Sequence, residues 1–306
     1  MPDDARAGEG ALPSPTEHRI RLRGVEHAVH EWPGADPPIV TMHGTGHHAH
    51  VWLEVLRRLQ ASGATMPRVL GIDYRGHGRS EVPSTPVTWP LLAEDAVALL
   101  RHLDVRDATG LGHSMGGTIM LYAAGRLPGA FDRLLLLDPT IFRREQYLPN
   151  EPSGVPEDHM FARRRNHFDS PEAMFERFRQ REPFDRWTEQ GLRDYCQHAL
   201  VPAPGGDGYV LACPGLVEAQ IYSLEKIADL HEQFVRVQAP VRILRARGAD
   251  LPLPSEGFMT SQCIPDVAEY LPGAASVEVI DCPELAHHIP LEDPELVARH
   301  LREVRG

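Results

Sequence analysis

The chain has 306 residues, 42% of them hydrophobic, and its formal net charge is −12. This length can bury a substantial core, in one large domain or two smaller ones, whereas the acidic balance argues against nucleic acid as a partner, because phosphate binding needs clustered Lys and Arg. Without a secretory signal or an apolar run of roughly 20 residues, which a membrane span needs, the sequence predicts a cytoplasmic protein with no membrane partner.

Short apolar runs alternate with helical patterns along most of the chain. Residues 1–16 are expected to form a flexible leader. Buried or paired strands are then predicted at 18–23, 25–32, 38–42, 68–73, 108–113, 132–138, 241–246 and 276–281. Apolar residues at helical spacing separate several of these runs and also follow the last one. The pattern predicts an α/β fold: a mostly parallel central sheet of about eight strands, with helices on both faces.

The stretch from residue 140 to residue 239 breaks this alternation. It shows no clear strand and is rich in charged and aromatic residues. A helix start is indicated by Ser170, Pro171 and Glu172, which supply a capping hydroxyl, a first-turn proline and a first-turn acid. Because the strand pattern resumes afterwards, we interpret 140–239 as a helical cap inserted into a core formed by 17–139 and 240–306. A separately folded second domain is the alternative.

The most specific motif is Gly-His-Ser-Met-Gly-Gly at residues 112–117. It follows a predicted strand and begins a predicted helix, which is the context of a nucleophile elbow. A sharp turn there would hold the Ser114 hydroxyl at the edge of the sheet, with the N-terminus of a helix behind it. The motif therefore predicts Ser114 as a nucleophile, against the alternative of an ordinary strand-to-helix turn with an incidental serine.

Four stretches, in order, make the chain resemble the α/β-hydrolase superfamily over roughly residues 20–305. They are His-Gly-Thr-Gly at 43–46, the Asp-Tyr-Arg-Gly-His-Gly-Arg-Ser run at 73–80, the elbow at 112–117, and the segment 287–295 that begins with two histidines. We expect the second stretch to be structural. The resemblance implies an oxyanion hole made by the backbone N–H groups of Thr45 and Met115.

The histidines at 43, 47, 48 and 50 offer a competing interpretation as metal ligands. Their spacing matches no standard ligand set, and no carboxylate or cysteine lies close to them in sequence, so we expect no metal and no cofactor. Some of these histidines are instead expected to shape the entrance to a pocket, and His43 is expected to brace its loop.

The resemblance also implies a base after the last strand and an acid between the nucleophile and that base. Counting back from Glu292 favours His287 over His288, although Ala286 stands where a glycine is usual. For the acid, Asp250 follows the strand at 241–246, and Asp138, at the end of the preceding strand, is the alternative. Of the two, we favour Asp250.

A Ser114, His287 and Asp250 triad implies a carboxylesterase-like hydrolase that cleaves an ester or lactone through an acyl-enzyme. Aromatic and methionine residues in the expected cap favour a partly apolar small-molecule substrate. The same fold also carries carbon–carbon bond hydrolases, thioesterases and acyltransferases, so the substrate rests on analogy. A receptor that binds a small molecule and turns it over slowly is an alternative of another class.

Overall fold

The computed structural model describes residues 12–147, 156–224, 229–248 and 259–306. The described chain begins its regular structure with a hairpin of β1 (Thr16–Leu22) and β2 (Val25–Trp32). Arg23 and Gly24 join the two strands with φ angles of 51° and 83°, as expected for a two-residue turn that follows the twist of the strands. β1 thus begins at the last residue of the leader predicted at 1–16, and residues 1–11 lie outside the described part.

Eight strands form the central sheet in the order β1-β2-β4-β3-β5-β6-β10-β11. From β4 to β11 all neighbours are parallel, and only β1 with β2 and β2 with β4 pair antiparallel. This confirms the predicted α/β fold with a mostly parallel sheet of about eight strands. The six further strands are β3 (Ala35–Met42), β4 (Pro67–Ile72), β5 (Ala108–His113), β6 (Phe131–Leu137), β10 (Val241–Ala246) and β11 (Val277–Cys282).

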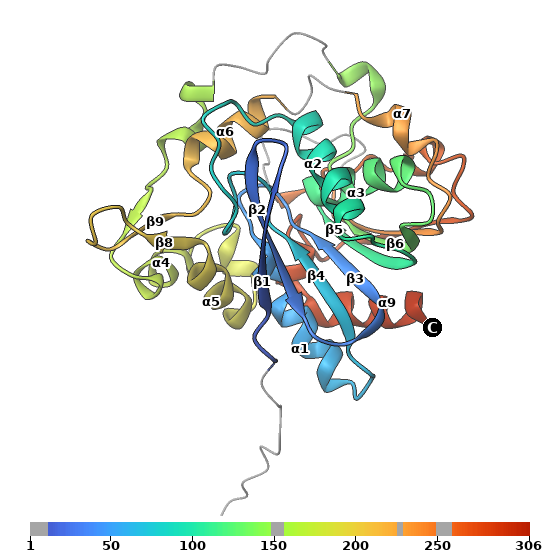
Figure 1. Ribbon diagram of the computed structural model, residues 1–306, viewed down its shortest axis with the longest axis horizontal. Coiled ribbons are helices and arrows are strands. Elements are labelled where there is room, and N and C mark those ends of the chain that lie inside the picture. The colour runs from blue at the N-terminus through green and yellow to red at the C-terminus, as the bar shows by residue number, and fades with distance from the viewer. Residues whose placement is uncertain (1–11, 148–155, 225–228, 249–258) are drawn as a thin grey trace, which may run out of the picture.

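Helices cover both faces of the sheet, as Figure 1 shows. On one face α1 (Leu53–Ala61) packs against α9 (Pro294–Arg305), and on the other α3 (Met115–Arg126) packs against α2 (Trp89–His102) and α7 (His231–Phe234). The four leucines of β6 alternate between the two buried clusters that result. Leu134 and Leu136 lie in one, Leu135 and Leu137 in the other. Because β6 is buried on both faces, its sequence contains a continuous apolar run rather than an alternating pattern.

The segment between the halves of the sheet is not purely helical, which corrects the expectation of no strand there. It contains a three-stranded antiparallel sheet, β7-β9-β8, whose strands are two or three residues long. Strands this short cannot show the alternation on which a sequence prediction rests. The elements are β7 (His167–Phe168), α4 (Pro171–Phe178), α5 (Glu189–His198), β8 (Leu200–Pro202), β9 (Tyr209–Leu211) and α6 (Gly215–Ser223).

The predicted start of α4 is present: Ser170 Oγ accepts a hydrogen bond from the N–H of Ala173 at 3.0 Å. Helix α5 packs on α1 and on the short 3-10 helix η1 (Ala49–Trp52), so this segment contacts the loop that follows β3. Other short helical turns are η2 (Arg144–Gln146), η3 (Pro156–Asp158), η4 (Met160–Arg163), η5 (Phe184–Arg186), η7 (Val267–Tyr270) and α8 (Ile289–Glu292).

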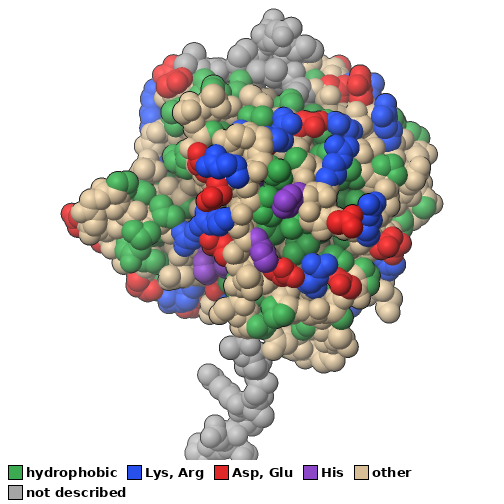
Figure 2. All heavy atoms as spheres, viewed as in Figure 1, with side chains coloured by type: hydrophobic (Ala, Val, Ile, Leu, Met, Phe, Trp, Pro, Cys, Tyr) green, Lys and Arg blue, Asp and Glu red, His purple; other side chains and the backbone are tan. Residues whose placement is uncertain are grey.

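The surface carries mixed charge on the face over β1 and β2. Figure 2 shows arginine and acidic side chains interspersed there, with apolar side chains between them. On β1, Arg19 pairs with Glu17 at 2.6 Å, and Arg21 pairs with Glu81 at 3.1 Å. Within the described residues, no helix combines the length and hydropathy needed to cross a membrane.

Candidate functional site

Ser114 stands at the sharp turn between β5 and α3. Its φ and ψ are 55° and −127°, a conformation that costs a non-glycine residue energy and that is held by the packing around it. A Cβ on Gly112 would lie 2.8 Å from the Cα of Gly117, and a Cβ on Gly116 would lie 2.2 Å from the carbonyl oxygen of Met42. Glycine is therefore required at both positions, because any side chain would push the turn away from its neighbours.

His287 lies directly against this serine. Its Nε2 is 2.8 Å from Ser114 Oγ, and its Nδ1 is 2.6 Å from Asp138 Oδ2. His287 comes from the loop between β11 and α8. The ring of His113 donates from Nε2 to the backbone carbonyl of His287 at 2.8 Å, which ties that loop to the elbow. Ser114, His287 and Asp138 thus form a continuous hydrogen-bonded chain with the geometry of a hydrolase triad.

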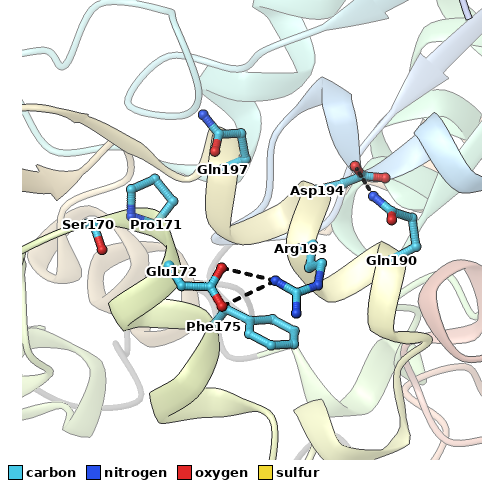
Figure 3. A pocket seen from close by; sticks show the side chains of 8 residues that line it. All are labelled: Ser170, Pro171, Glu172, Phe175, Gln190, Arg193, Asp194 and Gln197. Carbon is cyan, nitrogen blue, oxygen red and sulfur yellow. Dashed lines mark hydrogen bonds and ion pairs between the residues drawn. The ribbon is translucent and has the colours of Figure 1, made fainter. Parts of the chain in front are cut away.

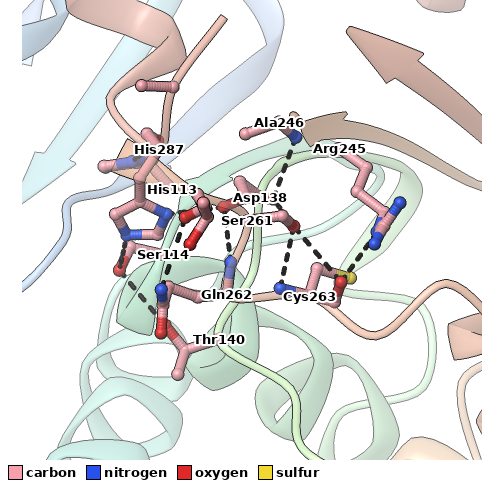
Figure 4. A network of polar contacts seen from close by, with 12 residues as sticks. His113, Ser114, Asp138, Thr140, Arg245, Ala246, Ser261, Gln262, Cys263 and His287 are labelled. Atoms are coloured by element: carbon pink, nitrogen blue, oxygen red, sulfur yellow. Dashed lines mark hydrogen bonds and ion pairs between the residues drawn. The ribbon is translucent and has the colours of Figure 1, made fainter. Parts of the chain in front are cut away.

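Asp138 accepts four hydrogen bonds at the end of β6 and is fully buried (Figure 4). Its Oδ1 accepts from the N–H of Ala246 at 3.0 Å and from Ser261 Oγ at 2.5 Å. Its Oδ2 accepts from the N–H of Gln262 at 2.9 Å, in addition to His287 Nδ1. These donors satisfy the carboxylate and fix its direction, so burial of the charge is compensated.

Among the described residues, the carboxylate that contacts the ring of His287 is Asp138, which the sequence left as the alternative to Asp250. A ring N–H at Nδ1 donates one hydrogen bond, and Asp138 accepts it at 2.6 Å. Asp250 lies outside the described residues. Of the two histidines that the sequence offered as the base, it is the favoured His287 whose ring contacts Ser114.

The predicted oxyanion residues are brought together beside Ser114. Thr45 Oγ1 lies 3.4 Å from Met115 Sδ, and a Cβ on Gly44 would be 3.1 Å from the Cβ of Ser114. Met115 is the first residue of α3, where backbone N–H groups have no acceptor within the helix. The loop after β3 and the start of α3 thus form one wall next to the nucleophile.

The histidines between residues 43 and 50 contact different neighbours. His43 Nδ1 donates to the carbonyl of Gly44 at 2.8 Å, in line with a brace for its loop. His47 stacks on His113, with ring centroids 5.7 Å apart, whereas His50 stacks on His198 at 3.7 Å. Within the described residues, no three histidine, cysteine or acidic side chains are grouped to hold a metal.

The same rings are buried and neutral. Burial, with repulsion from neighbouring histidines, holds the pKa of His47, His48 and His288 well below 6.5, and burial does the same for His113. Burial also lowers the pKa of His50 to about 2. The imidazole rings of His47, His113 and His288 around the triad are therefore uncharged.

These depressed pKa values predict that acid destabilises the fold. Below about pH 6.5 the unfolded chain binds protons that the buried rings exclude, so the free energy of unfolding falls as pH decreases, by about 1.4 kcal/mol per pH unit for each such histidine. Denaturant titrations between pH 7.5 and pH 5 measure the slope. His48→Gln should reduce the slope by one proton's worth, because an amide can keep the bond to the carbonyl of Tyr195 (3.1 Å) without titrating.

The matched control for that titration is His102→Gln, at an exposed position near the end of α2. This variant should keep the pH dependence of the original chain. An unchanged slope in His48→Gln would contradict the assignment of acid sensitivity to the buried rings.

The aromatic residues expected to line a pocket divide into two groups. Trp187 lies 5.1 Å from His288 and Tyr195 lies 5.6 Å from His47, measured between ring centroids, so both reach the surroundings of the triad. Phe178 instead packs on Phe168 and Phe184, away from those histidines.

A hollow of about 420 Å³ opens between α4 and α5, and no residue of the triad lines it (Figure 3). Arg193 covers the ring of Phe175 at 3.8 Å there and pairs with Glu172 at 2.9 Å. The charged groups of Arg193 and Glu172 are thus already engaged with each other. The hollow is lined by Ser170, Pro171, Glu172, Phe175, Gln190, Arg193, Asp194 and Gln197.

Sequence reasoning missed Thr140, whose Oγ1 lies 3.2 Å from Ser114 Oγ. Thr140 follows Asp138 by two positions, and adjacency to a candidate acid is the only signal in the sequence that could have drawn attention to it.

Comparison with known proteins agrees with this architecture. Residues 37–222 match the family model described as the alpha/beta hydrolase fold. A non-heme chloroperoxidase of Streptomyces lividans is 34% identical over 122 residues, which are 39% of this chain and 42% of that protein. A putative esterase/lipase of Haemophilus influenzae is 36% identical over 70 residues, 23% of this chain and 24% of that protein. The chain thus spans less than half of the length of either relative.

Solved structures match over nearly the whole chain. E-2-(acetamidomethylene)succinate hydrolase superposes with a TM-score of 0.70 at 20% identity, covering 95% of this chain and 100% of that one. A peroxisomal α/β-hydrolase of Saccharomyces cerevisiae gives a TM-score of 0.71 at 18% identity, covering 95% and 90%. The family model spans more than half of the chain, and the eight-stranded central sheet agrees with it. The chain therefore belongs to the α/β-hydrolase fold family.

Proposed function

We propose that this protein is a serine hydrolase that cleaves a carboxylic ester or lactone of a partly apolar small molecule. The observation that carries the proposal is the hydrogen-bonded chain from Ser114 through His287 to Asp138, with 2.8 Å and 2.6 Å between its heavy atoms. A serine within reach of a base that a carboxylate orients is the arrangement of an activated nucleophile.

In the proposed reaction, Ser114 Oγ attacks the substrate carbonyl carbon while its proton passes to His287 Nε2. Asp138 holds the ring so that Nε2 faces the serine and stabilises the imidazolium that forms. The oxyanion accepts hydrogen bonds from the backbone N–H groups of Thr45 and Met115. Donors placed in this way typically contribute about 3 kcal/mol each to transition-state stabilisation.

His287 then gives its proton to the leaving oxygen, and the substrate acyl group remains bonded to Ser114. A water molecule, deprotonated by His287, attacks the acyl carbon and releases the acid. No cofactor takes part in this sequence.

The surroundings of the triad support an uncharged, partly apolar substrate. His47, His113 and His288 are neutral, because burial keeps the pKa of each ring well below its ordinary value. Trp187 and Tyr195 lie against His288 and His47 and add apolar surface. A charged acyl group would lose its hydration in such surroundings, and the guanidinium of Arg164 is already paired with Glu218, which lies beside the loop that carries Gly46.

A burst experiment tests the proposal. We expect an aryl ester to release one equivalent of the aryl alcohol rapidly, followed by slower turnover as the acyl-enzyme hydrolyses. Hydrolysis rates with a panel of aliphatic esters, lactones, thioesters and amides then show which type of bond is cleaved fastest. Tight binding of panel members without any burst or turnover would contradict the proposal and favour a small-molecule receptor.

A further inference from the structure

We infer that the hydroxyl of Thr140 is a further catalytic group, which donates a hydrogen bond to the nucleophilic oxygen of Ser114. The inference deepens the proposed serine hydrolase activity and rests on it. Thr140 Oγ1 lies 3.2 Å from Ser114 Oγ, and the threonine is only 7% exposed. The hydroxyl therefore touches the reacting atom itself and is held away from bulk water.

The backbone around Thr140 fixes this contact. The N–H of Thr140 donates to the carbonyl of Ser114 at 3.3 Å, and its own carbonyl accepts from Thr118 Oγ1 at 2.7 Å. On either side, Asp138 is held by four donors and Ile141 forms a parallel bridge with Cys263. Hydrogen bonds on both sides of Thr140 thus hold the loop that carries its hydroxyl. Little ordering of this loop is therefore needed when the reaction begins.

Counting protons assigns the direction of the hydrogen bond. His287 gives its Nδ1 hydrogen to Asp138, so in the neutral ring Nε2 is an acceptor and Ser114 must donate to it. A serine hydroxyl has one hydrogen and two lone pairs. With its hydrogen given to His287, Ser114 Oγ can only accept from Thr140, which is therefore the donor.

This contact is strongest while negative charge develops on Ser114 Oγ, in its attack on the acyl carbon and again in its departure from it. When Ser114 Oγ forms its bond to the acyl carbon, its proton goes to His287 Nε2, and the Thr140 hydroxyl keeps its own proton while donating to the oxygen. In deacylation the bond between Ser114 Oγ and the acyl carbon breaks. The Thr140 hydroxyl then donates a hydrogen bond to the departing oxygen until His287 returns the proton to it. Hydrogen bonds to a charged oxygen are about twice as strong as neutral ones.

The test compares variants that separate the hydroxyl from the shape of the residue. Thr140→Val removes the hydroxyl and keeps the branched side chain, whereas Thr140→Ser keeps the hydroxyl. Thr41→Val is the matched control, because Thr41 is a buried residue of β3 whose hydroxyl has no hydrogen-bond partner among the described residues. Each variant is assayed for the rate of fluorophosphonate labelling and for kcat and KM with an aryl ester.

We expect Thr140→Val to lower the labelling rate and kcat about tenfold, with KM within about twofold of the original. Thr140→Ser should restore both rates to within about threefold, and Thr41→Val should leave them unchanged. Thr140→Ala carries the same expectation if the valine variant does not fold.

Two results would overturn this inference alone: original rates in both Thr140→Val and Thr140→Ala, or a loss in Thr140→Ser as large as that in Thr140→Val, which would point to packing of the methyl group. An original chain that neither labels nor hydrolyses any ester would overturn the proposed function as well.

Discussion

Replacing Ser114 with alanine is expected to lower kcat for an ester by a factor on the order of 10⁶, to the level that binding and the oxyanion donors alone provide. The variant loses the only atom that would bond to the substrate, and His287 then has no hydroxyl to deprotonate. Alanine fits the site, because it removes a single oxygen and leaves the packing of Gly112 and Gly116 unchanged. Steady-state hydrolysis, with circular dichroism to show the native fold, measures the effect.

The control for this variant is Ser62→Ala, which removes a serine hydroxyl at the end of α1 and should retain full turnover. Turnover by Ser114→Ala above about a hundredth of the original would mean that another group attacks the substrate.

Replacing Asp138 with asparagine is expected to reduce kcat by a factor on the order of 10⁴. An amide has only one oxygen, whereas Asp138 receives donors at both: Ala246 and Ser261 at Oδ1, and Gln262 and His287 at Oδ2. The NH₂ group of the asparagine would therefore face N–H or O–H donors at the position where Asp138 now offers an acceptor oxygen. His287 would then lose the acceptor that keeps its hydrogen on Nδ1 and leaves Nε2 ready to accept a proton.

The matched comparison is Asp250→Asn, which preserves size and removes the charge in the same way. We expect it to keep kcat within about threefold of the original. If the Asp250 variant instead loses more activity than the Asp138 variant, Asp138 is not the acid that serves His287.

Local sequence signals were sufficient for most of the sheet. The strands predicted at 108–113 and 241–246 have these bounds in the structure. Asp107 precedes the first run, and Pro240 and Arg247 flank the second, so residues unfavourable to a buried strand mark these ends. The elbow at 112–117 was also recognisable, since two glycines there are demanded by close backbone contacts. Strands β7 and β8 could not be foreseen, because two or three residues carry no periodic signal.

The choice between the two acids shows why the site was only partly predictable. Asp138 follows β6 and Asp250 follows β10 in the chain, and these two strands are parallel neighbours in the sheet. Residues at the carboxyl ends of adjacent parallel strands lie at the same edge, so sequence order alone could not decide between them. Thr140 was missed for a related reason, since its contact with Ser114 joins loops after two different strands.

The central claim is that Ser114 is the nucleophile, and the position of a fluorophosphonate adduct tests it most directly. Trypsin cleaves after Arg106 and Arg126 and releases a peptide, 107–126, in which Ser114 is the only serine. We predict a single adduct per chain, located on Ser114 by fragmentation of this peptide and absent after labelling of Ser114→Ala. An adduct on any other residue of a chain that hydrolyses esters would contradict the claim.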